Sequence, residues 1–209
     1  MAKIEPFEEH TSRYEDWFEK NKFAYLSELQ AVKILLPEIG DGVEIGVGSG
    51  RFSAPLGVKF GVEPSGRMGK IAKQRGIEVV GGVAENLPFA DGRFDYALMV
   101  TTICFLDDIK IAFLETRRIL KTDGQFVIGF VDKGSSLGKM YYKLKRENIF
   151  YRIATFYSVD EVVFHLEQAG FKYFNFNQTI FHDLNELTKI ESIKEGFGEG
   201  SFVVIRVSK

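Results

Sequence analysis

A short apolar strand that runs into three alternating glycines constrains this chain more than any other feature. Residues 43–50 read Val-Glu-Ile-Gly-Val-Gly-Ser-Gly, which places Gly46, Gly48 and Gly50 directly after the apolar stretch. Glycine lacks Cβ, so the chain can turn tightly there and a ligand can touch the main chain. A strand that ends in this way and leads into a helix presents free N–H groups at a nucleotide-sized crevice. The segment predicts the first strand, turn and helix of a nucleotide-binding sheet.

An acidic residue ends the next apolar run, which covers residues 58–62 and is followed by Glu63 and Pro64. A carboxylate at the tip of the second strand can accept hydrogen bonds from both hydroxyls of a ribose. A charged side chain at this position costs free energy unless it has partners. The alternative partner is the backbone at the start of a helix near Ser65. The glycine spacing disfavours a nicotinamide dinucleotide, because G-x-G-x-x-G would need glycine where Arg51 stands.

Three more segments follow in order: residues 79–89 as a third strand and loop, 94–100 as a fourth strand, and 117–128 as a helix, turn and fifth strand. With the glycine turn and its acid, they resemble class I S-adenosylmethionine-dependent methyltransferases over roughly residues 40–132. The match is close to the small-molecule branch that includes quinone-biosynthesis enzymes. The resemblance implies an α/β, Rossmann-like, doubly wound sheet of seven mostly parallel strands. Its implied order is 3-2-1-4-5-7-6, with the last strand antiparallel.

The resemblance also implies the ligands and the residues that hold them. S-adenosylmethionine would be the cofactor, S-adenosylhomocysteine the product, and an unidentified small molecule the methyl acceptor. Glu44 would help to hold the methionine amino end, directly or through water, unless it only satisfies nearby backbone N–H groups. Thr101 would lie beside the cofactor sulfur, unless it is simply a β-branched strand residue. The full set of expected cofactor contacts is Glu44, Gly46, Gly48, Gly50, Glu63, Pro64, Ala84, Glu85 and Thr101.

The sequence departs from the resembled family at two places. Val83 stands where relatives carry the acid that receives the adenine amino group, so Glu85 or the backbone of Ala84 must serve instead. Relatives often have histidines near Cys104 and Phe105, and this chain has none there. A catalytic base is therefore not assigned. The three histidines present do not have metal-ligand spacing, so no metal is expected.

The organisation predicted from the sequence is one methyltransferase domain over residues 1–209. Residues 1–37 would form an N-terminal helical cover, 40–132 the cofactor-binding core, and 133–209 the helices on the acceptor side with the last two strands. Residues 8–20 place three aromatic side chains on one helix face, which could close over the cofactor, pack on the sheet, or do both. These side chains are Tyr14, Trp17 and Phe18.

Composition limits the binding partners and the cellular location that we expect for this chain. The net charge of −2 gives no electrostatic footprint for nucleic acid, and the local basic face around residues 139–146 is interpreted as a solvated helix surface. The single cysteine, the lack of an apolar run of about 20 residues and the absence of a leader pattern favour a cytoplasmic protein without a membrane span. A protein or RNA methyltransferase and a non-catalytic cofactor-binding protein stay open as alternatives, and the oligomeric state is open too.

Overall fold

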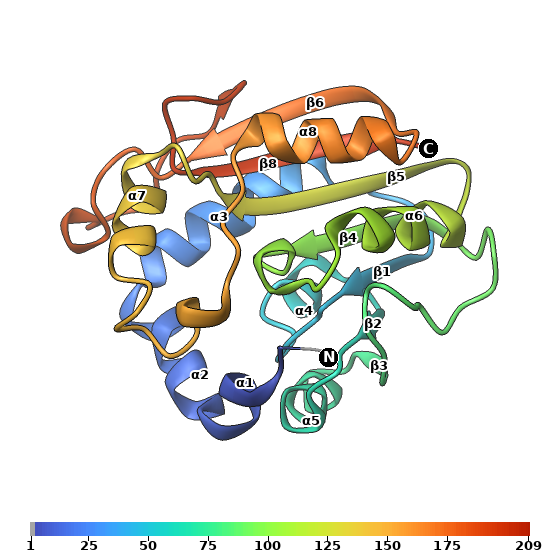
Figure 1. The fold of residues 1–209 in the computed structure, drawn as a ribbon, viewed down its shortest axis with the longest axis horizontal. Coiled ribbons are helices and arrows are strands. Elements are labelled where there is room, and N and C mark those ends of the chain that lie inside the picture. Colours follow the sequence, from blue (N-terminus) through green and yellow to red (C-terminus); the bar gives the residue numbers. More distant parts are fainter. Residues whose placement is uncertain (1–2) are drawn as a thin grey trace.

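The computed structural model describes residues 3–209 and shows one twisted sheet with helices on both faces (Figure 1). The strand order is β3-β2-β1-β4-β5-β8-β6-β7. Strands β1 to β5 pair in parallel, whereas β8 is antiparallel to both β5 and β6. The strands are β1 (Gly42–Ile45), β2 (Phe60–Val62), β3 (Glu78–Val80), β4 (Phe94–Val100), β5 (Leu120–Val131), β6 (Lys172–Thr179), β7 (Lys194–Glu195) and β8 (Phe202–Ser208).

This topology confirms the predicted fold class and the order of its seven main strands. The prediction of seven strands is one short, because Lys194 and Glu195 pair with Gln178 and Asn177 to add β7 at the edge. A two-residue strand has no periodic pattern of its own, so its pairing depends on the neighbouring β6. The glycine triplet of residues 196–200 is the turn between β7 and β8.

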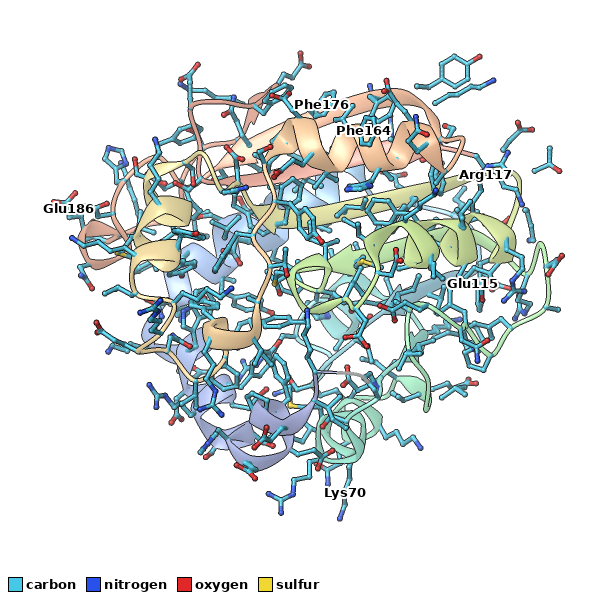
Figure 2. The ribbon with its side chains drawn as sticks, viewed as in Figure 1. Lys70, Glu115, Arg117, Phe164, Phe176 and Glu186 are labelled. Carbon is cyan, nitrogen blue, oxygen red and sulfur yellow. The ribbon has the colours of Figure 1, made fainter. Side chains whose placement is uncertain are left out.

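The helices fall into three groups around this sheet (Figure 1). Helices α6 and α8 cover one face, α3, α4 and α5 cover the other, and α1, α2 and α7 lie at the end where the parallel strands stop. Figure 2 labels Phe164 on α8 and Glu115 on α6, the two helices that cover the first of these faces. The helices are α1 (Glu5–Glu9), α2 (Thr11–Lys20), α3 (Lys22–Leu35), α4 (Ser53–Leu56), α5 (Gly66–Gln74), α6 (Ile109–Ile119), α7 (Ser136–Lys143) and α8 (Val159–Gln168), with short 3-10 turns η1 (Ile103–Phe105), η2 (Tyr151–Ile153) and η3 (Leu184–Glu186).

Two hydrophobic clusters pack on opposite faces of the sheet, because successive strand residues point to opposite sides. Val43, Ile45 and Met99 pack with residues of α6 and α8. Leu98 and Val100, the neighbours of Met99 on β4, pack with α3 instead. The central strands are therefore buried on both sides, which explains why residues 96–100 are all apolar or aromatic.

Local residue types account for several helix boundaries. Pro55 lies inside the one-turn helix α4, which Gly57 ends in a left-handed conformation at φ 74°. Ser158 and Glu161 form the reciprocal capping box at the start of α8. The predicted opening helix of residues 8–20 is different, since the chain begins a separate helix, α1, and breaks at His10 before α2. Helices α1 and α2 stand over the ends of the strands, where the glycine turn lies.

Candidate functional site

The glycine turn after β1 has the geometry of a ligand-binding loop. Gly46 and Gly48 adopt left-handed backbone conformations, with φ of 71° and 55°. A Cβ at Gly46 would lie 2.4 Å from Thr102 Cγ2, so that position accepts only glycine. A Cβ at Gly48 would lie 3.3 Å from the hydroxyl of Tyr14 and would project into the space below the opening helices. The turn therefore leaves its main chain bare on the side that faces a cavity.

Glu63 follows β2 and faces the same turn. Its Oε2 accepts a hydrogen bond of 2.8 Å from Gly48 N, and its Oε1 accepts one of 2.9 Å from Ser65 N. The residue is 9% exposed, and burial raises the pKa of its carboxyl to about 7, against the opposing backbone hydrogen bonds. Each oxygen has a second lone pair for another donor. The backbone at the start of α5 is thus one partner of this carboxylate, as the alternative predicted, and the contact with a ribose stays a prediction.

Glu85 and Thr101 belong to loops that follow β3 and β4. The Glu85 carboxylate accepts hydrogen bonds from the amides of Asp107, at 2.8 Å, and Asp108, at 3.2 Å, and so ties these two loops together. Thr101 has a φ of 51°, a rare conformation for a β-branched residue. Its amide donates to Gly129 O at 2.8 Å, which holds the strained position against β5. Such strain persists only where the surroundings enforce it, and it often marks a functional site.

These loops enclose a cavity of about 110 Å³ that touches most of the predicted cofactor residues. It is lined by Gly46, Gly48, Glu63, Pro64, Ala84, Glu85 and Thr101 from that set. The sequence did not identify Lys3, Ile4, Phe7 and Met68, which also line it. Nothing local marks these four residues, although the aromatic group that includes Tyr14 signalled that an opening helix could reach the site.

Glu44 and Gly50, the other two predicted cofactor residues, do not line this cavity. Glu44 accepts a short hydrogen bond from the hydroxyl of Ser53, and burial raises the pKa of its carboxyl to about 8. It alternates with Val43 and Ile45 on β1, so its side chain lies toward α4. A Cβ at Gly50 would lie 2.4 Å from Ile77 Cδ1, so the glycine there allows close packing against the segment after α5. Both residues therefore support the glycine turn on the side that faces away from this cavity.

An ionic network fastens the opening helices to the glycine turn. Arg51 pairs with Glu15 at 2.7 Å, and Arg75 pairs with the same carboxylate at 2.6 Å. Arg75 also donates to Ser49 O at 2.6 Å. Burial opposes ionisation of Glu15, but the hydrogen bonds from the two arginines outweigh it and lower its pKa. Because Arg51 and Ser49 flank Gly50, the position of α2 is coupled directly to the turn.

A second cavity of about 520 Å³ adjoins the first. The two cavities share four residues, Phe7, Tyr14, Thr101 and Phe105. Aromatic side chains dominate the second cavity, which lies between α2, α3, α7 and η2. Its volume is that of a site for a small organic molecule. The additional aromatic residues in its lining are Trp17, Phe18, Phe52, Phe130, Tyr141, Phe150, Tyr151, Phe156 and Tyr157.

No histidine lines either cavity in the part of the chain that the structure describes. Within residues 3–209, no cluster of three or more His, Cys, Asp or Glu side chains could hold a metal ion. A search of the same residues finds no helix that is long and apolar enough to cross a membrane. The two cavities offer glycine backbone, carboxylates, hydroxyls and aromatic rings, together with the thiol of Cys104 and the cationic side chains of Lys3, Arg13 and Lys20.

Comparison with known proteins places this fold and site in a family. A model of the methyltransferase domain matches residues 43–128. A SAM-dependent methyltransferase from Thermotoga maritima, described as a possible histamine N-methyltransferase, is 55% identical, and its crystal structure superimposes with a TM-score of 0.95 over 97% of both chains. The chain belongs to the S-adenosylmethionine-dependent methyltransferases of class I. It is an enzyme of that family, and S-adenosylmethionine is its cofactor.

Other relatives extend the match. An uncharacterized protein of Methanocaldococcus jannaschii is 43% identical over 203 residues, which cover 97% of this chain and 98% of the relative. An uncharacterized protein of Mycobacterium tuberculosis is 36% identical over 163 residues, and the match spans 76% of this chain but 57% of that longer protein. A SAM-dependent methyltransferase from Archaeoglobus fulgidus, at 16% identity and a TM-score of 0.72 over 96% of this chain and 100% of that one, shares the fold.

Proposed function

We propose that this enzyme methylates a small molecule that binds in the 520 Å³ cavity. The observation that carries the proposal is the shared wall of Phe7, Tyr14, Thr101 and Phe105 between this cavity and the smaller one beside the glycine turn. A volume of this size suits a compact organic molecule. The opening helices and α7 roof the cavity, which favours a small acceptor over a protein or RNA chain.

The residues of the smaller cavity fit the cofactor. We propose that Glu63 accepts hydrogen bonds from the ribose hydroxyls, since each of its oxygens is paired with only one backbone amide. The bare main chain at Gly46 and Gly48 would contact the sugar and the amino-acid part, and Pro64 would flank the ribose. Ala84 and Glu85 would border the adenine, and Thr101 the sulfur. Glu44 and Gly50 would act on the same ligand indirectly, through the turn that they support.

The cofactor, when bound, supplies an already activated methyl group on its sulfonium. The chain's own task is then to align the acceptor and to exclude water. Holding a nucleophile at about 3–3.5 Å in the correct direction can supply about 7–11 kcal/mol of the barrier. Thr101, Tyr14 and Phe105 contact both cavities and would set this alignment. The absence of a histidine along either described cavity fits an acceptor that is itself a good nucleophile.

Two finer proposals concern the acceptor. The sequence resemblance to the branch of quinone-biosynthesis methyltransferases supports an acceptor with a planar ring, which the aromatic walls of the larger cavity would hold. The similarity to the possible histamine N-methyltransferase of Thermotoga maritima supports an acceptor with an amine-bearing ring. We also propose a single domain in which the opening helices up to residue 37 cover the core of residues 40–132 and the segment 133–209 completes the acceptor side.

A labelled-methyl screen tests the proposed function. The purified enzyme is incubated with methyl-labelled S-adenosylmethionine and a cell extract that has been divided into low-mass, protein and RNA fractions. We expect the label in the low-mass fraction, where mass spectrometry identifies the product. The Glu63→Ala variant serves as the matched control and should label less product at limiting cofactor. Label that enters only the protein or the RNA fraction would reject the small-molecule acceptor.

A further inference from the structure

Glu28 is a buried acid in a position that packing alone does not explain. It lies on α3, whose face toward the sheet is otherwise small or apolar at Ala24, Ala31, Val32 and Leu35. The residue is 3% exposed, yet its side chain lines the 520 Å³ cavity. Within residues 3–209, its carboxyl has no hydrogen-bond or ion-pair partner. Such a group costs free energy to bury, so an unpartnered carboxyl aimed into a cavity indicates a missing ligand.

The helix that carries Glu28 is fixed in place. Ser27, the preceding residue, accepts a hydrogen bond of 2.8 Å from the amide of Glu191 and donates one of 2.7 Å to Phe23 O. Asn177 on β6 donates to Ala31 O at 3.3 Å. These contacts from distant parts of the chain hold α3 on both sides of Glu28. The carboxyl therefore cannot turn out to water without displacing the helix.

Aromatic rings stand around this carboxyl. A negative charge on Glu28 raises the pKa of Tyr141 on α7 and of Tyr151 on η2, so both rings are near the carboxyl. The centroids of these two rings are 4.4 Å apart. Trp17 lines the same cavity from α2. The other charged side chains of the lining are exposed, namely the acids Asp16 and Asp183 and the bases Arg13 and Lys20. A carboxylate among aromatic faces is the combination that binds organic cations, since the ring faces and the acid all attract positive charge.

We propose that Glu28 binds a protonated amine of the methyl acceptor and so makes the enzyme selective for cationic aromatic or arylalkyl amines. This proposal rests on the proposed function of the cavity. Glu28 lines only the larger cavity, whereas Thr101 and Phe105 line the wall that it shares with the cofactor cavity. The ammonium group would thus be anchored away from the transfer point. The acceptor needs a second atom, with a free lone pair, at the shared wall.

The transfer step fits this division of the acceptor. The lone pair of the second atom forms the new bond to the methyl carbon, while the carbon–sulfur bond breaks and its electrons remain on sulfur. A proton on that atom, if it carries one, leaves to solvent. The ammonium at Glu28 has no lone pair and takes no part in the bond changes. Glu28 is accordingly a specificity residue, and the methyl group should not be found on the anchored nitrogen.

Burial raises the pKa of the Glu28 carboxyl to about 8, so near pH 7 it is mostly neutral in the free enzyme. The titratable groups that interact with it, Tyr141 and Tyr151, have pKa values raised by their own burial and stay neutral as well. A bound ammonium would favour the charged carboxylate. Amine binding near pH 7 should therefore release close to one proton.

Equilibrium binding of matched ligands tests the proposal without requiring catalysis. Calorimetry with the full-length enzyme saturated in S-adenosylhomocysteine compares phenethylamine with 2-phenylethanol, and tyramine with tyrosol. Each pair differs in whether an ammonium or a hydroxyl ends the side chain. The variants are Glu28→Gln, which keeps the shape without the charge, and Glu38→Gln, an exposed control just beyond α3. Repeating the amine titration in buffers of different ionisation enthalpy counts the released protons.

At least one amine should bind the wild-type enzyme and Glu38→Gln at least about tenfold more tightly than its alcohol. Glu28→Gln should abolish that preference and the proton release, with unchanged affinity for S-adenosylhomocysteine and an intact melting transition. The proposal is overturned if neither amine is preferred over its alcohol, or if Glu28→Gln keeps the preference. If amines bind through Glu28 but no fraction accepts a methyl group, the proposed function fails and this inference stands. If the enzyme methylates a neutral acceptor and Glu28→Gln does not affect that transfer, the proposed function stands and this inference fails.

Discussion

Replacing Glu63 with alanine should weaken cofactor binding without unfolding the chain. The carboxylate accepts from the amides of Gly48 and Ser65, and each oxygen has one further lone pair for a ribose hydroxyl. A buried hydroxyl that loses its partner costs about 1–3 kcal/mol, and about 1.4 kcal/mol is a tenfold change in affinity. The affinity for S-adenosylhomocysteine should therefore fall by about 5-fold to 150-fold.

The effect of this substitution on stability should be smaller than its effect on binding. The variant loses two hydrogen bonds to backbone amides, but it also removes a carboxyl whose pKa is raised to about 7 by burial. These two contributions oppose each other. Calorimetry gives the affinity and thermal melting gives the stability, with Glu78→Ala on β3, an exposed acid one strand further on, as the control. A Glu63→Ala enzyme that binds S-adenosylhomocysteine as tightly as the wild type would refute the ribose assignment.

The remaining predictions concern the turn, the cover and pH. Gly48→Val should abolish cofactor binding in calorimetry, because its φ of 55° strains a β-branched residue and Cβ would lie 3.3 Å from the hydroxyl of Tyr14; normal folding and binding would mean that the triplet is only a turn. Residues 8–20 should exchange amide hydrogens more slowly with S-adenosylhomocysteine bound, and equal exchange would reject a lid. Burial raises the pKa of three carboxyls, to about 8 for Glu28 and Glu44 and about 7 for Glu63. The folded state then holds more protons than the unfolded state between pH 5 and 7. The free energy of unfolding should therefore fall over this range, by up to about 1.4 kcal/mol per pH unit for each group. Urea denaturation that shows constant or rising stability would contradict this.

The parts of the fold that the sequence predicted are those with local causes. The predicted strand of residues 94–100 is buried on both faces, and the local pattern of Ser158 and Glu161 forms the capping box that starts α8. The glycine turn was predictable because its left-handed backbone conformations favour glycine. β7 was not, since its two residues are strand only through their pairing with β6.

The parts of the site that the sequence did not predict depend on packing between distant segments. Lys3 and Phe7 reach the smaller cavity because α1 and the residues before it lie against loops far along the chain, and no local pattern encodes that contact. Glu44 does not line the smaller cavity, because the alternation of β1 turns it toward Ser53, and its contact with the cofactor, directly or through water, stays a prediction. Glu28 left one visible signal, an acid within an otherwise apolar helix stripe. Only the structure shows that this stripe borders a cavity.

The central claim is that a small acceptor binds in a cavity separate from that of the cofactor, and filling the larger cavity tests it most directly. Met140 on α7 lines only that cavity, while Leu144 just after the helix does not line it, and both are 41% exposed. The measurement is the rate of labelled methyl transfer to the low-mass fraction. Met140→Trp should slow transfer at least about tenfold with unchanged S-adenosylhomocysteine affinity, whereas Leu144→Trp should match the wild type. Wild-type transfer by Met140→Trp would contradict the account.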